Sequence, residues 1–478
     1  MRTFLSRLAA VLVLLSPLTA TAQDASLDNV AKAMGAAGVK SIQYSGSGTN
    51  FQLGQNFSPD VPWPRFVVKS YTRAVNYESA SIRDELVRTQ GENPPRGGGG
   101  QPVAGEQRQI FVASGDFAWN VAADVVTPTP IALVDRQLQL WTTPQGVVKA
   151  AIANNATVQG RTISFTAQGR FKVQATVDAQ NLVERIDAVA PNAVLGDAPV
   201  EIRYSEYKDF AGVKFPTRIR QTIGGYPVLD LTVTDVQPNL AVDIAVPDPI
   251  KQTSALYSKV ATQMVADGVW YITGGSHHSV LIEMKDHLIL VESPLNDERA
   301  AAVLAEVKSL VPNKPIKYVI ATHHHFDHAG GLRAVAAEGI TVIAHDVNKA
   351  FLEKALAAPA TIRPDRLAKS GKKGTVEGMR DKRVLTDGAR TVELHNVAGN
   401  NHHAGIVMVY LPKEKLLVEA DVYNPPAPNA PPPASVNTNW VNLSDNIKRL
   451  SMNVDQILPL HGRIMPLAEL HKSIGHSH

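Results

Sequence analysis

Residues 322–331, with the sequence THHHFDHAGG, restrict most strongly what this chain can fold into. An apolar, partly β-branched run precedes them at residues 316–321, and this composition is typical of a buried strand. Residues 332–338 are typical of a helix that ends at Gly339. The stretch is therefore predicted to form a turn between a buried strand and a helix.

Four potential metal ligands lie on this turn: His323, His325, Asp327 and His328. Side chains alternate direction along an extended segment, so His323 and His325 point the same way and can bind one ion while His324 turns away. Once the chain bends, Asp327 and His328 can face a second ion beside the first. Such a motif has meaning only in a suitable structural context, and the flanking strand and helix supply it. The stretch therefore predicts a metal site.

The N-terminus has the features of a secretory signal. It carries Arg2 and Arg7, then an apolar run at residues 8–15, then small residues at positions 20–22. The apolar run is too short to span a membrane comfortably. We therefore expect a signal peptide at residues 1–22 and a mature protein that is periplasmic or secreted, without stable membrane insertion.

The composition is that of a globular protein without thiol chemistry. The chain has 478 residues, of which 44% are hydrophobic and 19% charged, and this length suggests two or three domains. It contains no Cys, so a transition metal has to be bound by imidazole and carboxylate groups. The net charge is +3 and no Lys/Arg-rich run stands out, which gives nucleic-acid binding no support. The expected partner is a small-molecule substrate, and the sequence does not specify an oligomeric state.

Residues 23–250 are predicted to form a mainly antiparallel β domain (α+β). A helical lead-in at 23–38 and a helical segment at 131–151 accompany short segments of alternating polarity. The main strand candidates are residues 41–48, 65–71, 108–113, 116–121, 162–166, 171–177, 182–187, 200–204, 216–222 and 229–234. The tract at 91–102 is rich in Gly and Pro, which predicts a flexible surface loop. Together these features favour a curved sheet or an open barrel with one or two helices.

Residues 204–216 (YSEYKDFAGVKFP) resemble the half-barrel of periplasmic lipoprotein carriers. A resemblance in fold does not by itself give a function. All fifteen His residues lie at His277 or later in the chain. The N-terminal half is therefore not expected to share the metal chemistry.

A domain boundary is predicted at residues 246–250, so that residues 251–478 form a second domain. Beyond the boundary, apolar strands alternate with helices, including a helix at 297–311 and a strand and helix at 340–356. This alternation predicts an α/β domain in which helices cover the faces of the sheets.

Two ions need more ligands than the turn at 322–331 provides, because zinc sites use about four ligands each. Three residues elsewhere are suitable. His402 lies in a Gly/Asn-rich turn between two predicted strands, Asp421 follows an apolar strand, and His461 precedes Gly462. A carboxylate at the end of a strand can bridge two cations.

The order His323-x-His325-x-Asp327-His328, then His402, Asp421 and His461, resembles that of the metallo-β-lactamase superfamily, over about residues 260 to 470. The resemblance implies a four-layer αβ/βα sandwich with the metals at the edges of the sheets. It also implies two Zn2+ per chain. The first would be bound by His323, His325 and His402, the second by Asp327, His328 and His461, and Asp421 would bridge both.

The resemblance further implies that Asp327 is catalytic, orienting a metal-bridging hydroxide. Glu292 departs from the family pattern, in which many members have a supporting Asp, but Glu can do the same work one methylene further out. Four residues are candidates for substrate contact: His277, His278, His403 and Tyr423, with Trp440 an alternative to Tyr423 on the substrate wall. We expect His345 to be structural and His395 to be exposed.

These features predict an exported zinc-dependent hydrolase that attacks the carbonyl of a β-lactam, a lactone or another ester-like substrate. One alternative is an iron dioxygenase with a single metal on the same scaffold. Another is a carrier that binds an apolar ligand through its N-terminal β domain. The sequence does not distinguish the substrates.

Overall fold

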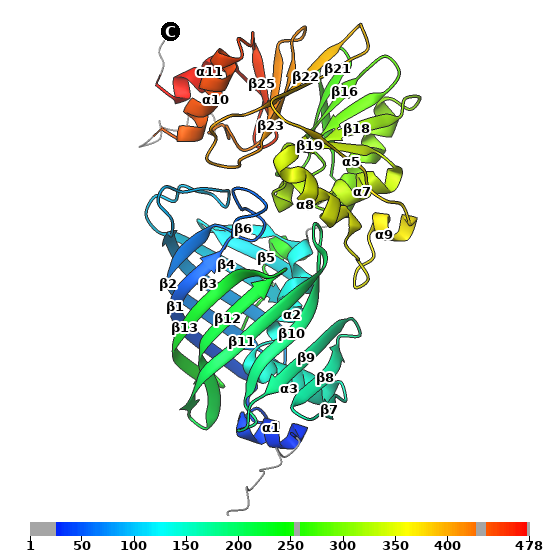
Figure 1. Cartoon of the computed structure of the whole chain (residues 1–478). Helices are drawn as coiled ribbons and strands as arrows, with labels where there is room; N and C mark the ends of the chain where they lie inside the picture. The colour runs from blue at the N-terminus through cyan, green and yellow to red at the C-terminus, as the bar shows by residue number, and fades with distance from the viewer. Residues whose placement is uncertain (1–24, 253–258, 427–435, 476–478) are drawn as a thin grey trace, which may run out of the picture.

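The computed structural model describes residues 25–252, 259–426 and 436–475. The predicted signal peptide, residues 1–22, lies outside these ranges. The structure consists of a large curved sheet from the N-terminal half and a layered α/β body from the C-terminal half, which is packed against one end of that sheet (Figure 1).

The N-terminal half forms one antiparallel sheet of thirteen strands, in the order β6-β5-β4-β3-β2-β1-β13-β12-β11-β10-β9-β8-β7. The chain steps outward from β1 to β6, crosses to the opposite edge at β7 and returns until β13 pairs with β1. The strands are β1 Ser41–Phe51, β2 Arg65–Asn76, β3 Ser81–Gln90, β4 Gln107–Ser114, β5 Phe117–Ala122, β6 Val125–Pro128, β7 Thr157–Gln159, β8 Thr162–Ala167, β9 Phe171–Val177, β10 Val183–Asn192, β11 Gly196–Phe210, β12 Val213–Ile223 and β13 Tyr226–Pro238. The prediction of a mainly antiparallel β region is confirmed.

Alternating polarity explains the curvature of this sheet around its helices. In β9, for example, buried Phe171, Val173 and Ala175 alternate with exposed side chains, so one face is apolar. The helices are α1 Leu27–Ala33, η1 Pro130–Ala132, α2 Leu133–Trp141, α3 Pro144–Ala153 and α4 Asp248–Lys251. The helix predicted at 131–151 is thus divided, because Pro144 begins a new helix and cannot donate a backbone hydrogen bond.

The C-terminal half contains two further sheets. Seven strands form one in the order β14 to β20, and six form the other in the order β21 to β26. The first comprises β14 Ala261–Ala266, β15 Val269–Thr273, β16 Ser279–Glu283, β17 Leu288–Val291, β18 Ile316–Ile320, β19 Thr341–His345 and β20 Val376–Met379. The second comprises β21 Lys382–Thr386, β22 Thr391–Asn396, β23 Val407–Leu411, β24 Leu416–Glu419, β25 Gln456–Pro459 and β26 Met465–Pro466. Strands β17 to β20 are parallel, and their connections run through helices.

Three apolar cores join these sheets and helices into four layers. One core lies between the two sheets, with Ile289 from the first and Val409 from the second. A second core packs helices against the first sheet, and a third packs helices against the second sheet. The helices are α5 Asp297–Leu310, α6 Phe326–Ala329, α7 Leu332–Glu338, α8 Asp346–Ala357, α9 Arg366–Ser370, α10 Thr438–Arg449 and α11 Leu467–Ser473. The predicted αβ/βα sandwich is confirmed, and the helix predicted at 297–311 is α5 (Figure 1).

The two halves are in direct contact. The domain boundary predicted at residues 246–250 stays a prediction. Backbone hydrogen bonds cross the contact from Phe326 N to Gly54 O and from Ala404 N to Phe57 O. The ring of Trp63 lies edge-on to that of Phe326, with centroids 6.2 Å apart. In Figure 1 the loops that follow β1 and β3 face the C-terminal half, and this arrangement places them beside the predicted metal ligands.

Candidate metal centre

The turn predicted from the sequence lies between β18 and α6. His323 and His325 are fully buried in the extended segment after β18, and Asp327 and His328 lie in the single turn of α6. His324 points away from the other two and bonds through Nδ1 to His403 Nε2, 2.6 Å away. The side chains of His323, His324 and His325 therefore alternate in direction, as expected at the end of a strand.

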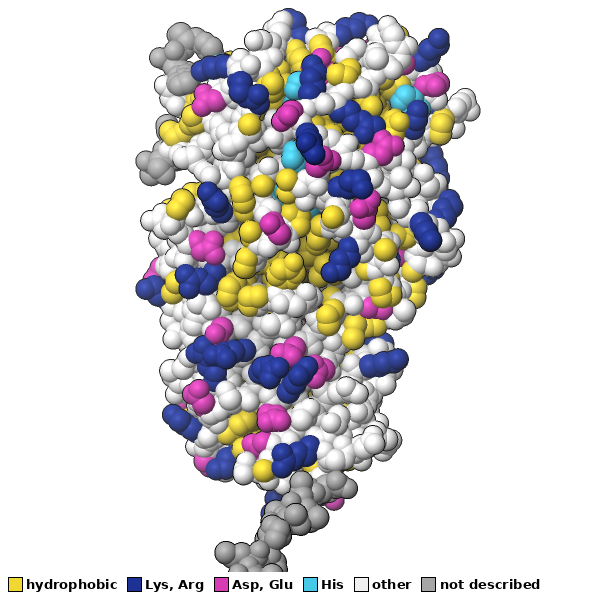
Figure 2. Space-filling view, in the orientation of Figure 1, with side chains coloured by type: hydrophobic (Ala, Val, Ile, Leu, Met, Phe, Trp, Pro, Cys, Tyr) yellow, Lys and Arg dark blue, Asp and Glu magenta, His cyan; other side chains and the backbone are white. Residues whose placement is uncertain are grey.

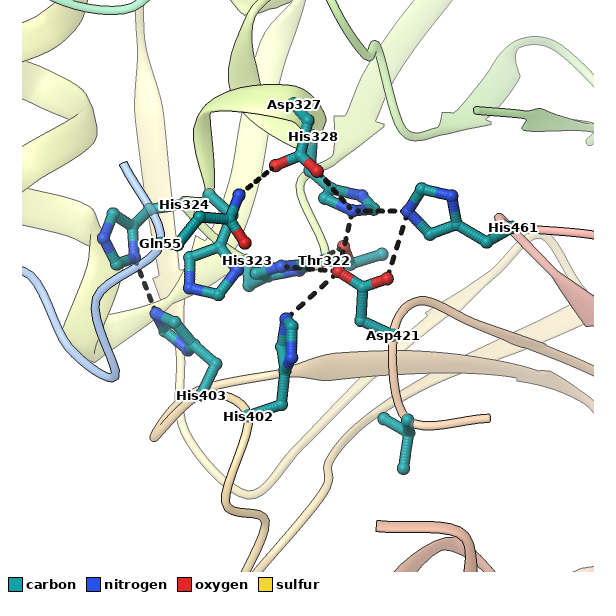
Figure 3. Close-up of polar contacts among 12 residues, drawn as sticks. Gln55, Thr322, His323, His324, Asp327, His328, His402, His403, Asp421 and His461 are labelled. Carbon is teal, nitrogen blue, oxygen red and sulfur yellow. Dashed lines mark hydrogen bonds and ion pairs between the residues drawn. The ribbon is translucent and has the colours of Figure 1, made fainter. Parts of the chain in front are cut away.

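The three predicted residues from elsewhere in the chain converge on this turn (Figure 3). Asp421, after β24, lies at the centre. Its Oδ2 is 2.9 Å from His328 Nε2, 3.1 Å from His402 Nε2 and 3.5 Å from His323 Nε2. Its Oδ1 is 3.0 Å from His461 Nε2. This carboxylate therefore touches side chains of both predicted ligand sets.

The side chains form two neighbouring groups that could each hold an ion. One consists of His323, His325, His402 and Asp421, and the other of His277, Asp327, His328 and His461. Within each group the ligand atoms lie within 4.8 Å of one another. All seven predicted ligands are brought together, and His277 joins them. Their roles as ligands remain a prediction.

In the first group, three buried imidazole nitrogens make no hydrogen bond in the described part of the chain: His323 Nε2, His325 Nδ1 and His402 Nε2. Two of them, Nε2 of His323 and Nε2 of His402, face the carboxylate of Asp421 at 3.5 and 3.1 Å. The other nitrogens of His323 and His325 are held, Nδ1 of His323 by the Thr322 hydroxyl and Nε2 of His325 by the Asn56 carbonyl. Burial lowers the pKa of His323 to about 3. It therefore presents a neutral lone pair at physiological pH, which is the form that binds metals. The donor set fits Zn2+, which prefers imidazole and carboxylate ligands in the absence of Cys.

In the second group, His328 Nε2 and His461 Nε2 face each other 3.1 Å apart. Burial opposes protonation of His328, but the carboxylates of Asp421 and Asp327 outweigh it and raise its pKa well above the ordinary value. Burial lowers the pKa of His277 to about 4. The carboxylates of Asp421 and Asp327 thus favour a positive charge at His328. A bound cation would supply that charge.

Glu292 supports the centre as the resemblance implied. Its Oε2 accepts hydrogen bonds from the Thr322 hydroxyl at 2.5 Å and from His328 Nδ1 at 3.1 Å. Because Nδ1 of His328 is held, its Nε2 is turned toward Asp421. Partners of this kind orient metal ligands and select their tautomer.

The candidates for substrate contact are placed differently. His277 Nε2 lies 3.2 Å from Asp327 Oδ2, inside the ligand cluster. His278 bonds to the Gly462 carbonyl, and His403 is buried against His324. Tyr423 is fully buried, and its hydroxyl bonds to Ser473. Of these four, only His277 joins a group of candidate ligand atoms, while the ring of His403 packs against those of His323 and His325.

Trp440, His345 and His395 each lie where their role can be judged. Trp440 lines a cavity of about 520 Å³ that opens onto Asp327, His402 and Asp421. His345 accepts a hydrogen bond from Val347 N and caps α8, as expected for a structural residue. The exposed position expected for His395 is wrong, because it is only 3% exposed and bonds to Glu393.

The N-terminal half is not expected from its sequence to share the metal chemistry, but two of its residues contact predicted ligands. Gln55 Nε2 donates to Asp327 Oδ1 at 2.7 Å, and the Asn56 carbonyl accepts from His325 Nε2 at 2.9 Å. Gly97 and Gly98, expected in a surface loop, are buried against Gln55. The sequence signals available were the polar turn after β1 and the glycine tract. Neither contains an imidazole, and the carboxylate of Glu92 in the tract accepts from Arg65 N instead of reaching the centre.

Comparison with known proteins supports the assignment of the C-terminal region. A family model of the metallo-β-lactamase superfamily matches residues 272–425. The alpha subunit of 2,4-dinitroanisole O-demethylase from a Nocardioides species is 26% identical over 209 residues, which are 42% of this chain and 57% of that protein. A linear primary-alkylsulfatase from a Pseudomonas species is 33% identical over 75 residues, 16% of this chain and 11% of the sulfatase. The chain thus spans little more than half of the first relative and a small part of the second.

Two solved metallo-β-lactamase structures are similar to part of this chain. The metallo-β-lactamase from Pontibacter korlensis is 19% identical, with 46% of this chain and 98% of that chain covered and a TM-score of 0.35. The FIM-1 metallo-β-lactamase from Pseudomonas aeruginosa, in its mono-zinc form, is 17% identical, with 46% and 94% covered and a TM-score of 0.35. The family match, which ends before His461, together with the αβ/βα layers, identifies residues 272–425 as part of a metallo-β-lactamase superfamily domain.

Proposed function

We propose that the protein is a hydrolase that uses two zinc ions to attack the carbonyl of a β-lactam, a lactone or another ester-like substrate. The observation that carries this proposal is the set of three buried imidazole nitrogens without hydrogen-bond partners, all in one cluster of described residues around Asp421. A buried polar atom without a partner is costly, so a cluster of them indicates a ligand that completes it.

The side chains have distinct roles in this proposal. His323, His325 and His402 would hold one ion, Asp327, His328 and His461 the other, and Asp421 would contact both. When bound, the ions would lower the pKa of a shared water molecule and polarise the carbonyl of the substrate. Asp327, whose Oδ2 is the oxygen not bonded by Gln55, would orient that water. Thr322 and Glu292 would hold His323 and His328 in the required tautomers.

The proposal includes export to the periplasm or the medium, and a small molecule as the only partner. Among the described residues, no helix is both long and apolar enough to cross a bilayer. On the face seen in Figure 2, Lys and Arg side chains are interspersed with Asp and Glu instead of forming one basic patch. This distribution supports the proposal that nucleic acid is not a partner.

The test combines turnover and metal analysis on the same sample. The substrate panel contains a chromogenic cephalosporin, a lactone and a bis-phosphodiester. It also contains 2,4-dinitroanisole and a primary alkyl sulfate, because these are the substrates that the names of the two relatives indicate. We expect about two zinc ions per chain and turnover of an ester-like compound that is lost in His323→Ala. One iron per chain, or turnover that survives His323→Ala, would contradict the proposal, and the former would favour the dioxygenase.

The carrier hypothesis has a possible site in a second cavity, of about 300 Å³, in the N-terminal sheet. Its lining includes the ion pair of Arg73 and Asp84, and the hydroxyl of Tyr71, which has no partner among the described residues. A purely apolar ligand would leave the Tyr71 hydroxyl without a hydrogen bond and would face a buried ion pair. A lipid that copurifies with a protein inactive on the whole panel would nevertheless favour the carrier.

A further inference from the structure

We propose that two loops of the N-terminal half, residues 52–57 and 97–101, are a working part of the metal centre: they position two metal ligands, and with the facing residues they form a wall that selects an uncharged substrate. This inference rests on the proposed function, because it concerns the same site. It assigns a role to a half of the chain that contains no His.

Gln55 acts on Asp327. Its side chain is buried, its Nε2 donates to Asp327 Oδ1 at 2.7 Å, and its Oε1 accepts from the backbone N–H of Gly99 at 3.0 Å. Both ends of the carboxamide are thereby fixed. One oxygen of Asp327 is occupied by Gln55, and the other, Oδ2, is turned toward His277 and His328. Gln55 is thus a positioning residue, which decides which carboxylate oxygen faces the ion (Figure 3).

Asn56 acts on the next ligand. Its backbone carbonyl accepts from Nε2 of His325 at 2.9 Å, which leaves the buried Nδ1 of that imidazole without a hydrogen-bond partner among the described residues. The tautomer that presents the Nδ1 lone pair is therefore selected by the N-terminal half. The Asn56 side chain also bonds to His324 and to the backbone carbonyls of Ser58 and Val61, so the carbonyl is held in place.

The first loop fits closely against the C-terminal half. Gly54 has a φ of +69°, and a Cβ on it would lie 2.2 Å from Cγ of Phe326. Its carbonyl accepts from Phe326 N, while the carbonyl of Phe57 accepts from Ala404 N. Only glycine meets both the backbone and the steric requirement at position 54. The loop is thus fixed on either side of Gln55 and Asn56.

The second loop closes over the first. Gly98 N donates to the Gln55 carbonyl, and Gly97 N donates to the carbonyl of Asn401, which is adjacent to His402. A Cβ on Gly98 would lie 1.9 Å from Oε1 of Gln55 and 3.0 Å from Cε1 of His402. The glycine tract therefore allows the backbone to approach a ligand at a distance that no other residue permits.

The wall of the cavity indicates the class of substrate. Besides ligands, the lining of the cavity of about 520 Å³ includes six carboxamide side chains: Gln52, Gln55, Gln101, Asn424, Asn437 and Asn439. The described lining includes no Lys or Arg to neutralise a carboxylate or a phosphate.

Most of these carboxamides have their oxygen already engaged. Oε1 of Gln52 accepts from Arg88, Oδ1 of Asn437 from Asn439 N, and Oδ1 of Asn439 from Asn401 N. Among the described residues, the NH2 groups of these three side chains are left as donors, whereas those of Gln55 and Gln101 donate to Asp327 and to backbone carbonyls. Such a wall suits an uncharged substrate that carries hydrogen-bond acceptors, such as ester or ether oxygens.

The first test uses zinc alone as the probe and the full-length protein. We compare Gln55→Met with Gln43→Met, a matched substitution at a half-buried glutamine near the other end of β1. Affinity is measured by competition with a chromogenic chelator, and thermal unfolding is measured on the metal-free protein. We expect Gln55→Met to weaken one of two zinc sites by about tenfold or more, with an unfolding temperature equal to that of Gln43→Met.

Unchanged zinc affinity in Gln55→Met would overturn the positioning role, as would a loss of affinity matched by Gln43→Met. If the Met variant does not fold, the zinc affinity of the smaller substitution Gln55→Ala is measured instead. A wild-type protein that binds no zinc would instead overturn the proposed function itself, so the two failures are distinguishable.

The second test measures binding of two zinc-chelating aryl hydroxamates that differ only in a distal methyl ester or carboxylate. Calorimetry on the zinc-loaded protein requires no turnover. We expect the methyl ester to bind at least about fivefold more tightly, because the wall offers the carboxylate no cation. Asn424→Lys, which adds a cation to this wall, should narrow or reverse the difference. Equal or tighter binding of the carboxylate by the wild-type protein would overturn the substrate class.

Discussion

The two halves of this protein bury polar side chains in opposite ways. In the N-terminal sheet the guanidinium of Arg73 donates to both oxygens of Asp84, at 2.6 and 2.5 Å, and also to Gln139. In the C-terminal half, buried nitrogens of His323, His325 and His402 have no hydrogen-bond partner among the described residues. The first arrangement is complete without a ligand, and the second is not.

This difference teaches which buried polar groups are structural and which are functional. A paired charge in an apolar sheet is compensated by its partner, so it contributes specificity of packing and no chemistry. Several nitrogens that make no hydrogen bond and converge on one carboxylate are suited to hold a shared cation. Polar burial alone therefore does not identify a site, whereas the pattern of partners does.

Metal removal should have the largest effect, and only on the C-terminal half. At a free zinc concentration of about 1,000 times the dissociation constant, each bound zinc would stabilise the folded protein by about 4 kcal/mol. We expect chelation to lower the unfolding temperature, and His323→Ala to remove most of the zinc-dependent part, as measured by calorimetry. His287→Ala, in the same half but outside the ligand groups, is the control. A zinc response in His323→Ala equal to that of the control would break the comparison.

The buried ion pair in the N-terminal half should show a large effect on stability and none on metal binding. Arg73→Met leaves the carboxylate of Asp84 buried without its partner, and we expect a loss of about 3–5 kcal/mol in urea unfolding. The double variant with Asp84→Leu should recover much of that loss, because both charges are then absent. Zinc affinity should be unchanged in both, and a weakened zinc site would contradict a purely structural role for the pair.

A substitution at the contact between the halves should have an intermediate effect, on the zinc affinity of the centre. Gly54→Ala forces a methyl group into the ring of Phe326, so we expect the loop to shift and zinc affinity to fall by about tenfold. Gly212→Ala is the matched control, since Gly212 also has a positive φ, +84°, but nothing lies within 4 Å of its Cβ position. That variant should lose about 1–2 kcal/mol of stability and keep its zinc affinity. Equal zinc affinities in the two variants would show that the loop does not act on the centre.

The smallest effect is expected at Tyr423, which the structure places in an apolar core behind Trp440 and outside the cavity lining. Tyr423→Phe removes the hydrogen bond to Ser473 and should cost about 1 kcal/mol in urea unfolding. The affinity for zinc and the KM for any panel substrate should not change. A raised KM would place the residue on the substrate wall after all.

The opening turn and its three distant partners could be predicted because each has a local signature. Imidazoles at alternate positions after an apolar strand, and an Asp at a strand end, are visible in short windows of sequence. The buried position of His395 could not be predicted, since the alternation that suggested exposure does not reveal which face of β22 another layer covers. Tyr423 likewise lies next to a loop in sequence, but its ring fills a core between the second sheet and helices α10 and α11.

The sequence by itself determined the candidate ligands and an α/β domain with helix-covered sheets, because motifs and periodicity are local properties; the four layers were implied by the family resemblance that the order of those ligands carries. Only the tertiary structure decided that Gln55 would lie against Asp327, a residue 272 positions later. A neutral carboxamide in a turn leaves no pattern that names its partner. Its role arises from the way in which two separately patterned halves pack together.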